Sequence, residues 1–230
     1  MKLLRELYYK KYSKKSYAIS NVDLVIDRLL KNKKKGFYID IGCNHPIKYN
    51  NTFLLYKRGW NGINIDLDRK SIKQFNIFRP NDINLEIALS DKEKKKDVYF
   101  YHERSAINTL SKSLMQKRKK KPRIIYKIKT QTLNNVLNKI SINNNKINLM
   151  SIDVENHEFQ VLKSFNFQKY KIDVVVIEFT DLSKKLETYN LSVEKIIRSK
   201  IYKLLCKNNY RLINWVNSDL IFLHKKSNLR

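Results

Sequence analysis

Cysteine, glycine and proline are scarce in this 230-residue chain, which contains two, four and three of them respectively. Two cysteines, Cys43 and Cys206, are too few for a disulfide framework or a zinc cluster. Such low cysteine usage is typical of a reducing compartment, so we expect a cytoplasmic location.

Long apolar runs are also lacking. The longest, such as residues 174–177, stop far short of the roughly 20 residues that a membrane-spanning helix needs. The first six residues already carry charge, which is too early for the apolar region of a signal peptide. We therefore expect no transmembrane segment and no secretion signal.

Acidic residues are few: 21 Asp and Glu stand against 48 Lys and Arg, a formal net charge of +27. Such a charge attracts nucleic acid, anionic lipid or a phosphorylated substrate. AT-rich coding DNA explains the same composition, because Lys, Asn, Ile, Tyr and Phe are abundant while Gly and Pro are rare. We favour this coding bias over nucleic-acid binding, and keep peripheral contact with an anionic membrane as a further alternative.

The chain is long enough for one sizeable α/β core. Residues 1–35 are interpreted as an N-terminal helical extension, a lid or brace, and residues 36–230 as one domain. From residue 36 onward, short aliphatic runs alternate with helical stretches, which is typical of βαβ units around a parallel sheet. The expected strands are 37–41, 62–66, 83–88, 147–153 and 172–178, and the expected helices are 52–57, 71–78, 133–140, 158–164 and 193–206.

Two further features interrupt or end this pattern. Residues 97–102 and 123–129 are predicted to be extra strands around a basic helical stretch at 111–121, an insertion that we expect to shape a substrate pocket. At the C-terminus, apolar runs at 210–215 and 220–223 are joined by Asn-Ser-Asp, which predicts an antiparallel hairpin.

An acidic residue and a glycine stand at the end of the first expected strand, in the segment 38–46. Ligands of open α/β sheets bind at the carboxyl ends of strands, where Gly42 lets the backbone approach closely. Asp40 can accept hydrogen bonds from turn amides or, through water, from a ligand ammonium group. Asn44 and His45 stand beside the turn and are candidate contacts for a ligand. The alternative is that Asp40 only fixes the turn.

The next two expected strands are also followed by carboxylates. Asp66 comes about 24 residues after Gly42, near the roughly 20-residue interval at which an acidic strand end binds ribose hydroxyls. Asp68 is the local competitor, although capping the next helix is its simpler role. Asp91 follows the third strand, where it either accepts the amino proton of adenine or is a solvated turn residue.

Carboxylates and an imidazole are concentrated after the fourth expected strand, in residues 150–158. Asp153 and His157 are candidate general bases. Asp153 and Glu155 are two apart on an extended segment and therefore face the same side, so they are candidate ligands for a divalent cation. The alternatives are a helix-dipole role for Glu158 and a surface cap for His157. Glu178 ends the fifth strand, and we expect it beside an acceptor pocket.

Taken in order, these segments resemble the FkbM family of S-adenosylmethionine-dependent methyltransferases. The resemblance implies a Rossmann-like methyltransferase fold, a mostly parallel sheet with a C-terminal antiparallel hairpin that dinucleotide dehydrogenases normally lack. It implies methyl transfer to a hydroxyl of a sugar, glycan or related small molecule. The matching segments are 38–46, 51–66, 79–91 and 151–155; Asp40 and Gly42 match the first cofactor motif, Asp66 the ribose-binding acid, and Asp153 with Glu155 the D-x-E motif.

Two departures from the family pattern lie in loops. Asn156 stands where the family commonly has glycine after the D-x-E motif, and Asn tolerates left-handed backbone. His45 and Pro46 replace the second glycine of the first loop.

Other classes of protein remain as alternatives. An RNA ribose methyltransferase, or a basic nucleic-acid-binding protein with a methyltransferase-like fold, would use the positive charge. The segment 153–156 replaces the Asn/Asp-Pro-Pro-aromatic motif of base N-methylation, which argues against that reaction. Retention of Asp40, Asp66 and Asp153 together argues against a decayed enzyme. The acceptor, the metal dependence and the oligomeric state are left open at this point.

Overall fold

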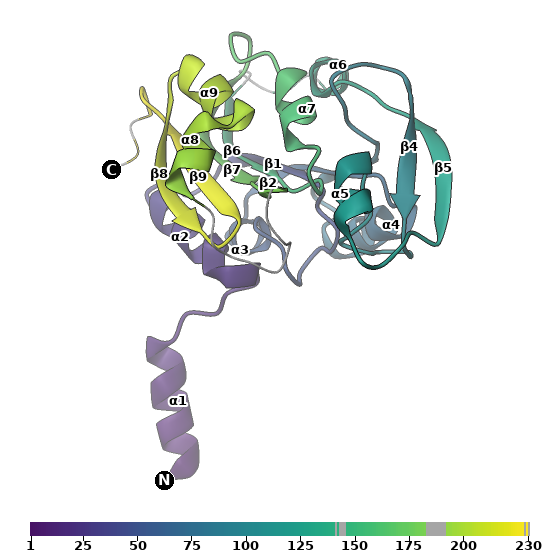
Figure 1. The fold of residues 1–230 in the computed structure, drawn as a ribbon. Helices are drawn as coiled ribbons and strands as arrows, with labels where there is room; N and C mark the ends of the chain where they lie inside the picture. Colours follow the sequence, from purple (N-terminus) through teal and green to yellow (C-terminus); the bar gives the residue numbers. More distant parts are fainter. Residues whose placement is uncertain (141, 143–145, 183–191, 228, 230) are drawn as a thin grey trace.

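A computed structural model describes residues 1–140, 142, 146–182, 192–227 and 229 of the chain (Figure 1). Within this part, seven strands form one sheet in the order β3-β2-β1-β6-β7-β9-β8. The predicted α/β class and the mostly parallel sheet with a C-terminal hairpin are confirmed. The strands are β1 (Phe37–Ile41), β2 (Asn61–Asp66), β3 (Ile83–Glu86), β6 (Lys146–Ile152), β7 (Lys171–Glu178), β8 (Tyr210–Val216) and β9 (Asp219–His224).

The sheet is parallel from β3 to β7, and β9 is antiparallel to both of its neighbours. A two-residue connection, Asn217 and Ser218, joins β8 to β9, and Asn217 takes a left-handed φ of 54°. The chain therefore runs along the edge strand β8 first, reverses at this turn, and then enters the sheet between β7 and β8 as β9.

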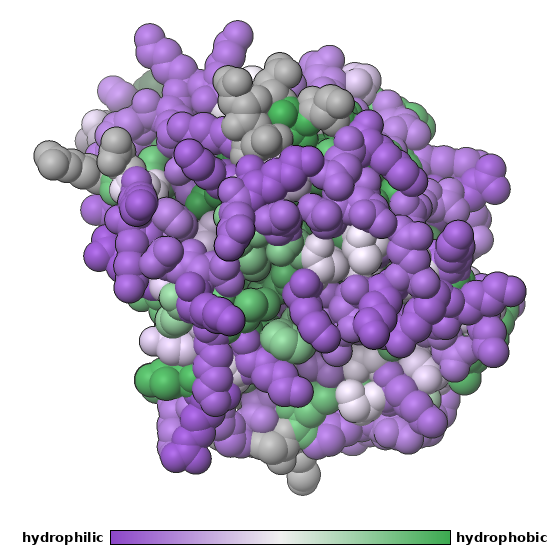
Figure 2. Space-filling view, turned by 90° about the horizontal axis from the view of Figure 1, so that it is seen from above, coloured by the Kyte–Doolittle hydropathy of each residue, from purple (hydrophilic) through white to green (hydrophobic). Residues whose placement is uncertain are grey.

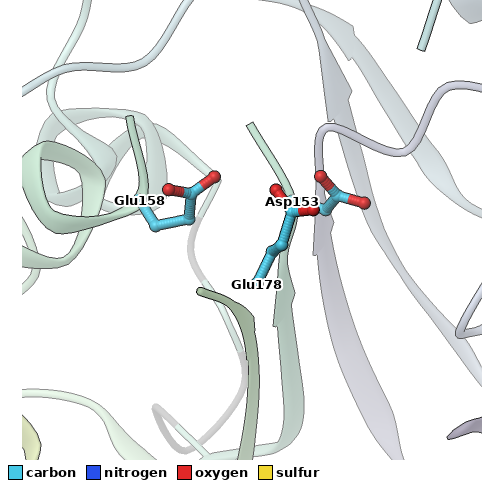
Figure 3. A group of neighbouring side chains, drawn as sticks. All are labelled: Asp153, Glu158 and Glu178. Atoms are coloured by element: carbon cyan, nitrogen blue, oxygen red, sulfur yellow. The ribbon is translucent and has the colours of Figure 1, made fainter. Parts of the chain in front are cut away.

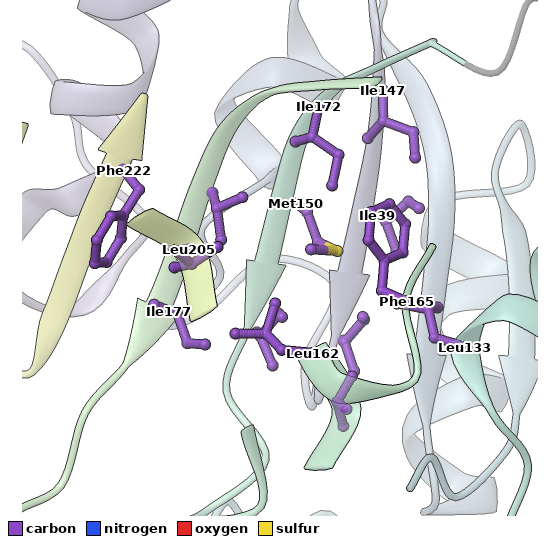
Figure 4. Close-up of a cluster of buried hydrophobic side chains, with 14 of the residues drawn as sticks. Ile39, Leu133, Ile147, Met150, Leu162, Phe165, Ile172, Ile177, Leu205 and Phe222 are labelled. Carbon is purple, nitrogen blue, oxygen red and sulfur yellow. The ribbon is translucent and has the colours of Figure 1, made fainter. Parts of the chain in front are cut away.

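Helices cover both faces of the sheet because its central strands are apolar on both sides. Ile39 and Met150 face the helices α6 (Leu133–Lys139), α7 (Glu158–Lys163) and α9 (Lys200–Lys207), whose apolar residues form one core cluster with the sheet (Figure 4). Their neighbours in sequence, Tyr38 and Leu149, face the opposite cluster with α2 (Val22–Leu29) and α3 (Phe53–Lys57). The alternation has the period of two expected of strands.

Two helix boundaries differ in how well the sequence predicts them. The helix α4 (Arg69–Phe78) begins two residues before the predicted start at 71, and Asp68 caps it as expected: its carboxylate accepts hydrogen bonds from the backbone N–H groups of Lys70 and Ser71. The single helix expected at 193–206 is wrong. It is divided into α8 (Val193–Arg198) and α9, because Ser199 is extended (φ −66°, ψ 151°) and its side chain caps α9.

The N-terminal residues behave as two different segments. The helix α1 (Lys2–Tyr12) has no buried residue and extends away from the body of the molecule (Figure 1). In contrast, α2 buries Val22 and Ile26 completely against the sheet. The domain boundary at residue 36 stays a prediction. In the described part of the chain, no helix combines the length and the apolar character that crossing a membrane requires.

The insertion between β3 and β6 forms the expected elements. The strands β4 (Lys95–Phe100) and β5 (Ile124–Lys129) pair antiparallel, and α5 (Lys112–Lys117) lies between them in sequence. This two-stranded ribbon is separate from the main sheet.

Candidate active site

One hollow lies at the carboxyl ends of β1, β2 and β6, where the fold class places its ligands. The insertion contributes Ser105, Ala106, Asn108 and Leu110 to its wall. Most of the site residues predicted from the sequence line this hollow, whereas Asp40, His45, Asp91 and Glu178 do not. Those that line it are Gly42, Asn44, Asp66, Asp153, Glu155 and His157.

Gly42 joins the ends of three strands. Its backbone N–H donates to the carbonyl of Ile65 at 2.8 Å, and the N–H of Asp153 donates to the carbonyl of Ile41 at 2.9 Å. Gly42 takes a φ of +76°, and a Cβ atom there would lie 1.7 Å from the carbonyl oxygen of Asp153. The close approach that requires glycine is therefore to the protein backbone at β6.

Asp66 connects the turn after β1 with the turn after β2. Its carboxylate accepts hydrogen bonds from the backbone N–H groups of Asn44, at 2.9 Å, and Asp68, at 2.8 Å. Burial raises the pKa of Asp66 to about 6, so the carboxylate is mainly ionised at neutral pH. Each carboxylate oxygen has two lone pairs, which leaves acceptor capacity for ligand hydroxyls.

Asp40 lies beneath the first turn rather than in the wall of the hollow. Its carboxylate accepts hydrogen bonds from the Asn50 amide at 2.9 Å and the Thr52 hydroxyl at 2.7 Å. Burial raises the pKa of Asp40, and the nearby Arg79 guanidinium opposes this shift. This position matches the alternative in which Asp40 fixes the turn.

Arg79 organises the same loop and was missed in the sequence. Its side chain is completely buried, and it donates to Asn50 Oδ1 at 2.6 Å, Thr52 Oγ1 at 2.8 Å and the Pro46 carbonyl at 2.8 Å. It also lies 3.9 Å from Asp82 in an ion pair. A lone arginine among 48 basic residues carries no sequence signal of burial, so only the tertiary contacts identify it.

Three carboxylates converge beside the hollow, at the ends of β6 and β7 and the start of α7 (Figure 3). Ligand atoms of Asp153, Glu158 and Glu178 all lie within 4.8 Å of one another. Glu158 accepts hydrogen bonds from the N–H groups of Val154 and Asn156, both at 3.0 Å. Among the described residues, Oε2 of Glu178 is buried without a hydrogen-bond partner.

Burial and mutual repulsion alter the ionisation of these carboxylates. Loss of solvation beside the neighbouring groups raises the pKa of Asp153 to about 6 although the residue is exposed, and burial raises that of Glu158 to about 8. Burial and the charge of Asp153 hold the pKa of Glu178 well above its ordinary value. Oxygen ligands of this kind suit a divalent cation. Asp153, Glu158 and Glu178 lie close enough together to be candidate ligands for such a cation.

Glu155, the other predicted metal ligand, is differently engaged. It forms an ion pair of 2.5 Å with Arg118, which follows α5 in the insertion. Burial and the charge of Asp153 raise its pKa to about 8 despite this cation. A metal ion held by Asp153 and Glu155 stays a prediction.

His157 is buried at the start of α7 and makes no capping hydrogen bond with its ring, so the surface-cap alternative is wrong. Its Nε2 atom lies 3.0 Å from Ser90 Oγ and 3.3 Å from Lys96 Nζ. Burial, followed by the charge of Lys96, lowers its pKa to about 4. The imidazole is therefore neutral at physiological pH, and its contacts with Ser90 and Lys96 involve Nε2.

Asp91 lies outside the hollow. Its carboxylate accepts a hydrogen bond from the Ser90 hydroxyl at 3.2 Å and lies 3.8 Å from the Lys163 ammonium. Burial alone would raise its pKa, but this hydrogen bond and the neighbouring lysines lower it. The adenine contact predicted for Asp91 stays a prediction.

Left-handed backbone shapes two of the loops that line the hollow. Asn44 has a φ of 50°, and Glu155 and Asn156 have φ values of 56° and 65°. The expectation that Asn156 preserves the turn in place of glycine is confirmed. Thr109 of the insertion donates to the Glu155 carbonyl at 2.7 Å, so the insertion supports this turn.

The family model of the methyltransferase FkbM domain matches residues 40–212. No curated protein matches the sequence. Among solved structures, the chain is similar to a TehB-like SAM-dependent methyltransferase from Corynebacterium glutamicum, with 12% identity over 97% of this chain and 96% of that chain and a TM-score of 0.43.

Proposed function

The chain belongs to the FkbM methyltransferase family, and we propose that it transfers a methyl group from S-adenosylmethionine to a hydroxyl of a sugar, glycan or related small molecule. The observation that carries this proposal is the meeting of Asp66 and Asp153 in one hollow at the strand ends. The Asp66 carboxylate can accept hydrogen bonds from the ribose hydroxyls of a nucleoside. The Asp153 carboxylate can accept the proton that an acceptor hydroxyl loses.

The residues of the hollow fit the parts of this cofactor. Asp66 offers a carboxylate to the ribose hydroxyls, which are hydrogen-bond donors. Ile87, Ala88 and Leu89 supply apolar wall for the adenine, and the turn at Gly42 and Asn44 lies on the side of β1. Bound S-adenosylmethionine would supply the methyl group from its sulfonium, and S-adenosylhomocysteine would remain after the methyl group passes to the acceptor oxygen.

Asp153 is the general base that the ionisation of the site favours. Its pKa of about 6 leaves it mainly ionised at neutral pH while keeping it a stronger base than an ordinary carboxylate. His157, with a pKa of about 4, is a weaker base. Glu155 is paired with Arg118. We assign Asp153 as the base that removes the proton of the acceptor hydroxyl. We assign His157 and Glu155 as residues that shape the pocket.

One observation favours a second candidate, an RNA ribose methyltransferase. A hollow lined by Lys94, Lys95, Lys96 and Lys127 lies beside the first one and shares Leu110 with it. Hydrophilic residues cover most of the face seen in Figure 2. Phosphate groups of an acceptor would be attracted to the four lysines of this second hollow.

Labelled S-adenosylmethionine distinguishes the two candidates. The purified protein is incubated with a glycan fraction and, separately, with RNA, and mass spectrometry then locates the added methyl group. We expect label in the glycan fraction with the wild type and at least about a hundredfold less with Asp153→Asn, because general-base catalysis typically contributes about 100-fold or more. Label confined to RNA would establish the second candidate, and an undiminished rate in Asp153→Asn would exclude Asp153 as the base.

A further inference from the structure

The helix α1 exposes apolar side chains to an unusual degree. None of its residues is buried, and it extends from the body on the segment that follows Tyr12 (Figure 1). Leu3, Leu4 and Leu7 are 70%, 66% and 56% exposed. Several large apolar residues exposed together mark an interaction site.

These apolar side chains share one side of the helix. Residues four apart lie on the same face of a helix, which aligns Leu3 with Leu7 and Leu4 with Tyr8. Tyr12 continues the second row, and its ring centroid lies 4.9 Å from that of Tyr8. Lys2 and Glu6 lie on the opposite side, Lys10 borders the row of Leu3, and Lys11 continues the row of Leu3 and Leu7 at the C-terminal end of the helix.

The charge of this segment is strongly positive. Residues 1–16 contain six basic side chains and one acidic side chain, a net charge of +5. The basic residues are Lys2, Arg5, Lys10, Lys11, Lys14 and Lys15. The segment therefore combines an apolar face with a surplus of cations.

We propose that α1 binds the surface of an anionic membrane and lies parallel to it. The leucines would enter the boundary between headgroups and acyl chains, and the tyrosines would sit at headgroup level, where their rings are amphipathic. The lysines would contact anionic headgroups, and long lysine side chains beside the apolar face can extend toward the water. With eleven residues α1 is about 16 Å long, too short to span a bilayer of about 30 Å.

Charge and apolar surface together favour this occupant over two others. RNA would neutralise the cations but would leave the leucines in water. A second copy of α1 would cover the leucines but would bring two segments of charge +5 together. An anionic bilayer satisfies both faces of the helix, and it does so independently of the methyl-transfer reaction.

Vesicle flotation of the full-length protein tests this proposal. We expect binding to phosphatidylcholine vesicles that contain phosphatidylglycerol and little binding to phosphatidylcholine alone. The double variant Leu4→Gln/Leu7→Gln keeps the charge and removes the apolar face, and it should bind at least about tenfold more weakly. Ile77→Gln is the matched control, because Ile77 is 71% exposed on α4 and belongs to the body; it should bind like the wild type.

Three results would overturn the proposal. The wild type could fail to bind the anionic vesicles, the leucine variant could bind them as tightly as the wild type, or RNA could compete with the vesicles while binding is insensitive to the leucines. A urea-denaturation midpoint equal to that of the wild type shows that the fold of the leucine variant is intact, so loss of vesicle binding is attributable to α1.

Discussion

The carbonyl oxygen of Asp153 occupies the space in which a side chain at Gly42 would begin. A Cβ atom at position 42 would lie 1.7 Å from that oxygen, far inside van der Waals contact. The end of β1 and the end of β6 therefore approach each other only because residue 42 is glycine. This contact brings the turn after β1, which we propose to hold the cofactor, next to the proposed base.

Alanine substitution separates this contact from backbone strain. Gly42 and Gly59 both have left-handed φ values, +76° and +82°, but nothing lies within 4 Å of a Cβ at Gly59. We expect Gly59→Ala to lower the free energy of unfolding by about 1 kcal/mol through strain alone. Gly42→Ala should lower it by about 3 kcal/mol or more, because the clash adds to the strain. Urea denaturation measures both, and equal losses would contradict the contact.

Arg79 is expected to support the first loop through its buried charge. Arg79→Met removes the cation and leaves Asp40 and Asp82 buried without it, which should cost about 3–5 kcal/mol of unfolding free energy. Arg198→Met is the control, because Arg198 pairs with Glu194 on the surface with 76% of its side chain exposed. That pair should contribute less than about 1 kcal/mol. Similar stabilities of the two variants in urea would show that Arg79 does not hold the loop.

The raised pKa of Glu158 predicts an unusual dependence of stability on pH. A carboxyl with a folded-state pKa of about 8 binds its proton more tightly in the folded than in the unfolded protein. The folded state is therefore favoured at low pH, and this contribution is lost as pH rises from the ordinary carboxyl pKa of about 4 toward 8. Glu158→Gln should retain the acceptor for Val154 and Asn156 but flatten the decline between about pH 6 and pH 8.

Urea denaturation of the wild type and Glu158→Gln across this pH range provides the comparison. Glu93→Gln serves as the control, because Glu93 is exposed to solvent. A slope that is the same in all three proteins would show that Glu158 has an ordinary pKa in the folded state.

The strands and the position of the site were predictable because each depends on local patterns. Mostly apolar residues at Phe37–Ile41 and at 174–177 can be buried on both faces only in the middle of a sheet. Acidic residues that follow such runs, such as Asp66, must then lie at the carboxyl edge. The Asn-Ser turn before β9 likewise combines local turn chemistry with two apolar strands.

The pairing of charges within the site was not predictable, since it depends on contacts between distant segments. Arg118 is 37 residues from Glu155 in sequence, and Glu178 reaches Asp153 only because β7 is the neighbour of β6. The contacts of Arg79 could not be predicted for the same reason, because its partners Pro46, Asn50 and Thr52 lie on another loop. The division of 193–206 into two helices depends on Ser199, which is as compatible with a helix interior as with a cap in the sequence alone.

Calorimetric titration of S-adenosylhomocysteine into the wild type and Asp66→Asn tests the central claim, that this hollow binds the cofactor. Asn keeps the size of the side chain but lacks the negative charge that strengthens hydrogen bonds from the ribose hydroxyls. The affinity for S-adenosylhomocysteine should therefore fall by about tenfold or more. Asp97→Asn, on the exposed edge of β4, should bind like the wild type. A folded wild-type protein that does not bind, or an Asp66→Asn variant that binds as tightly as the wild type, would contradict the account.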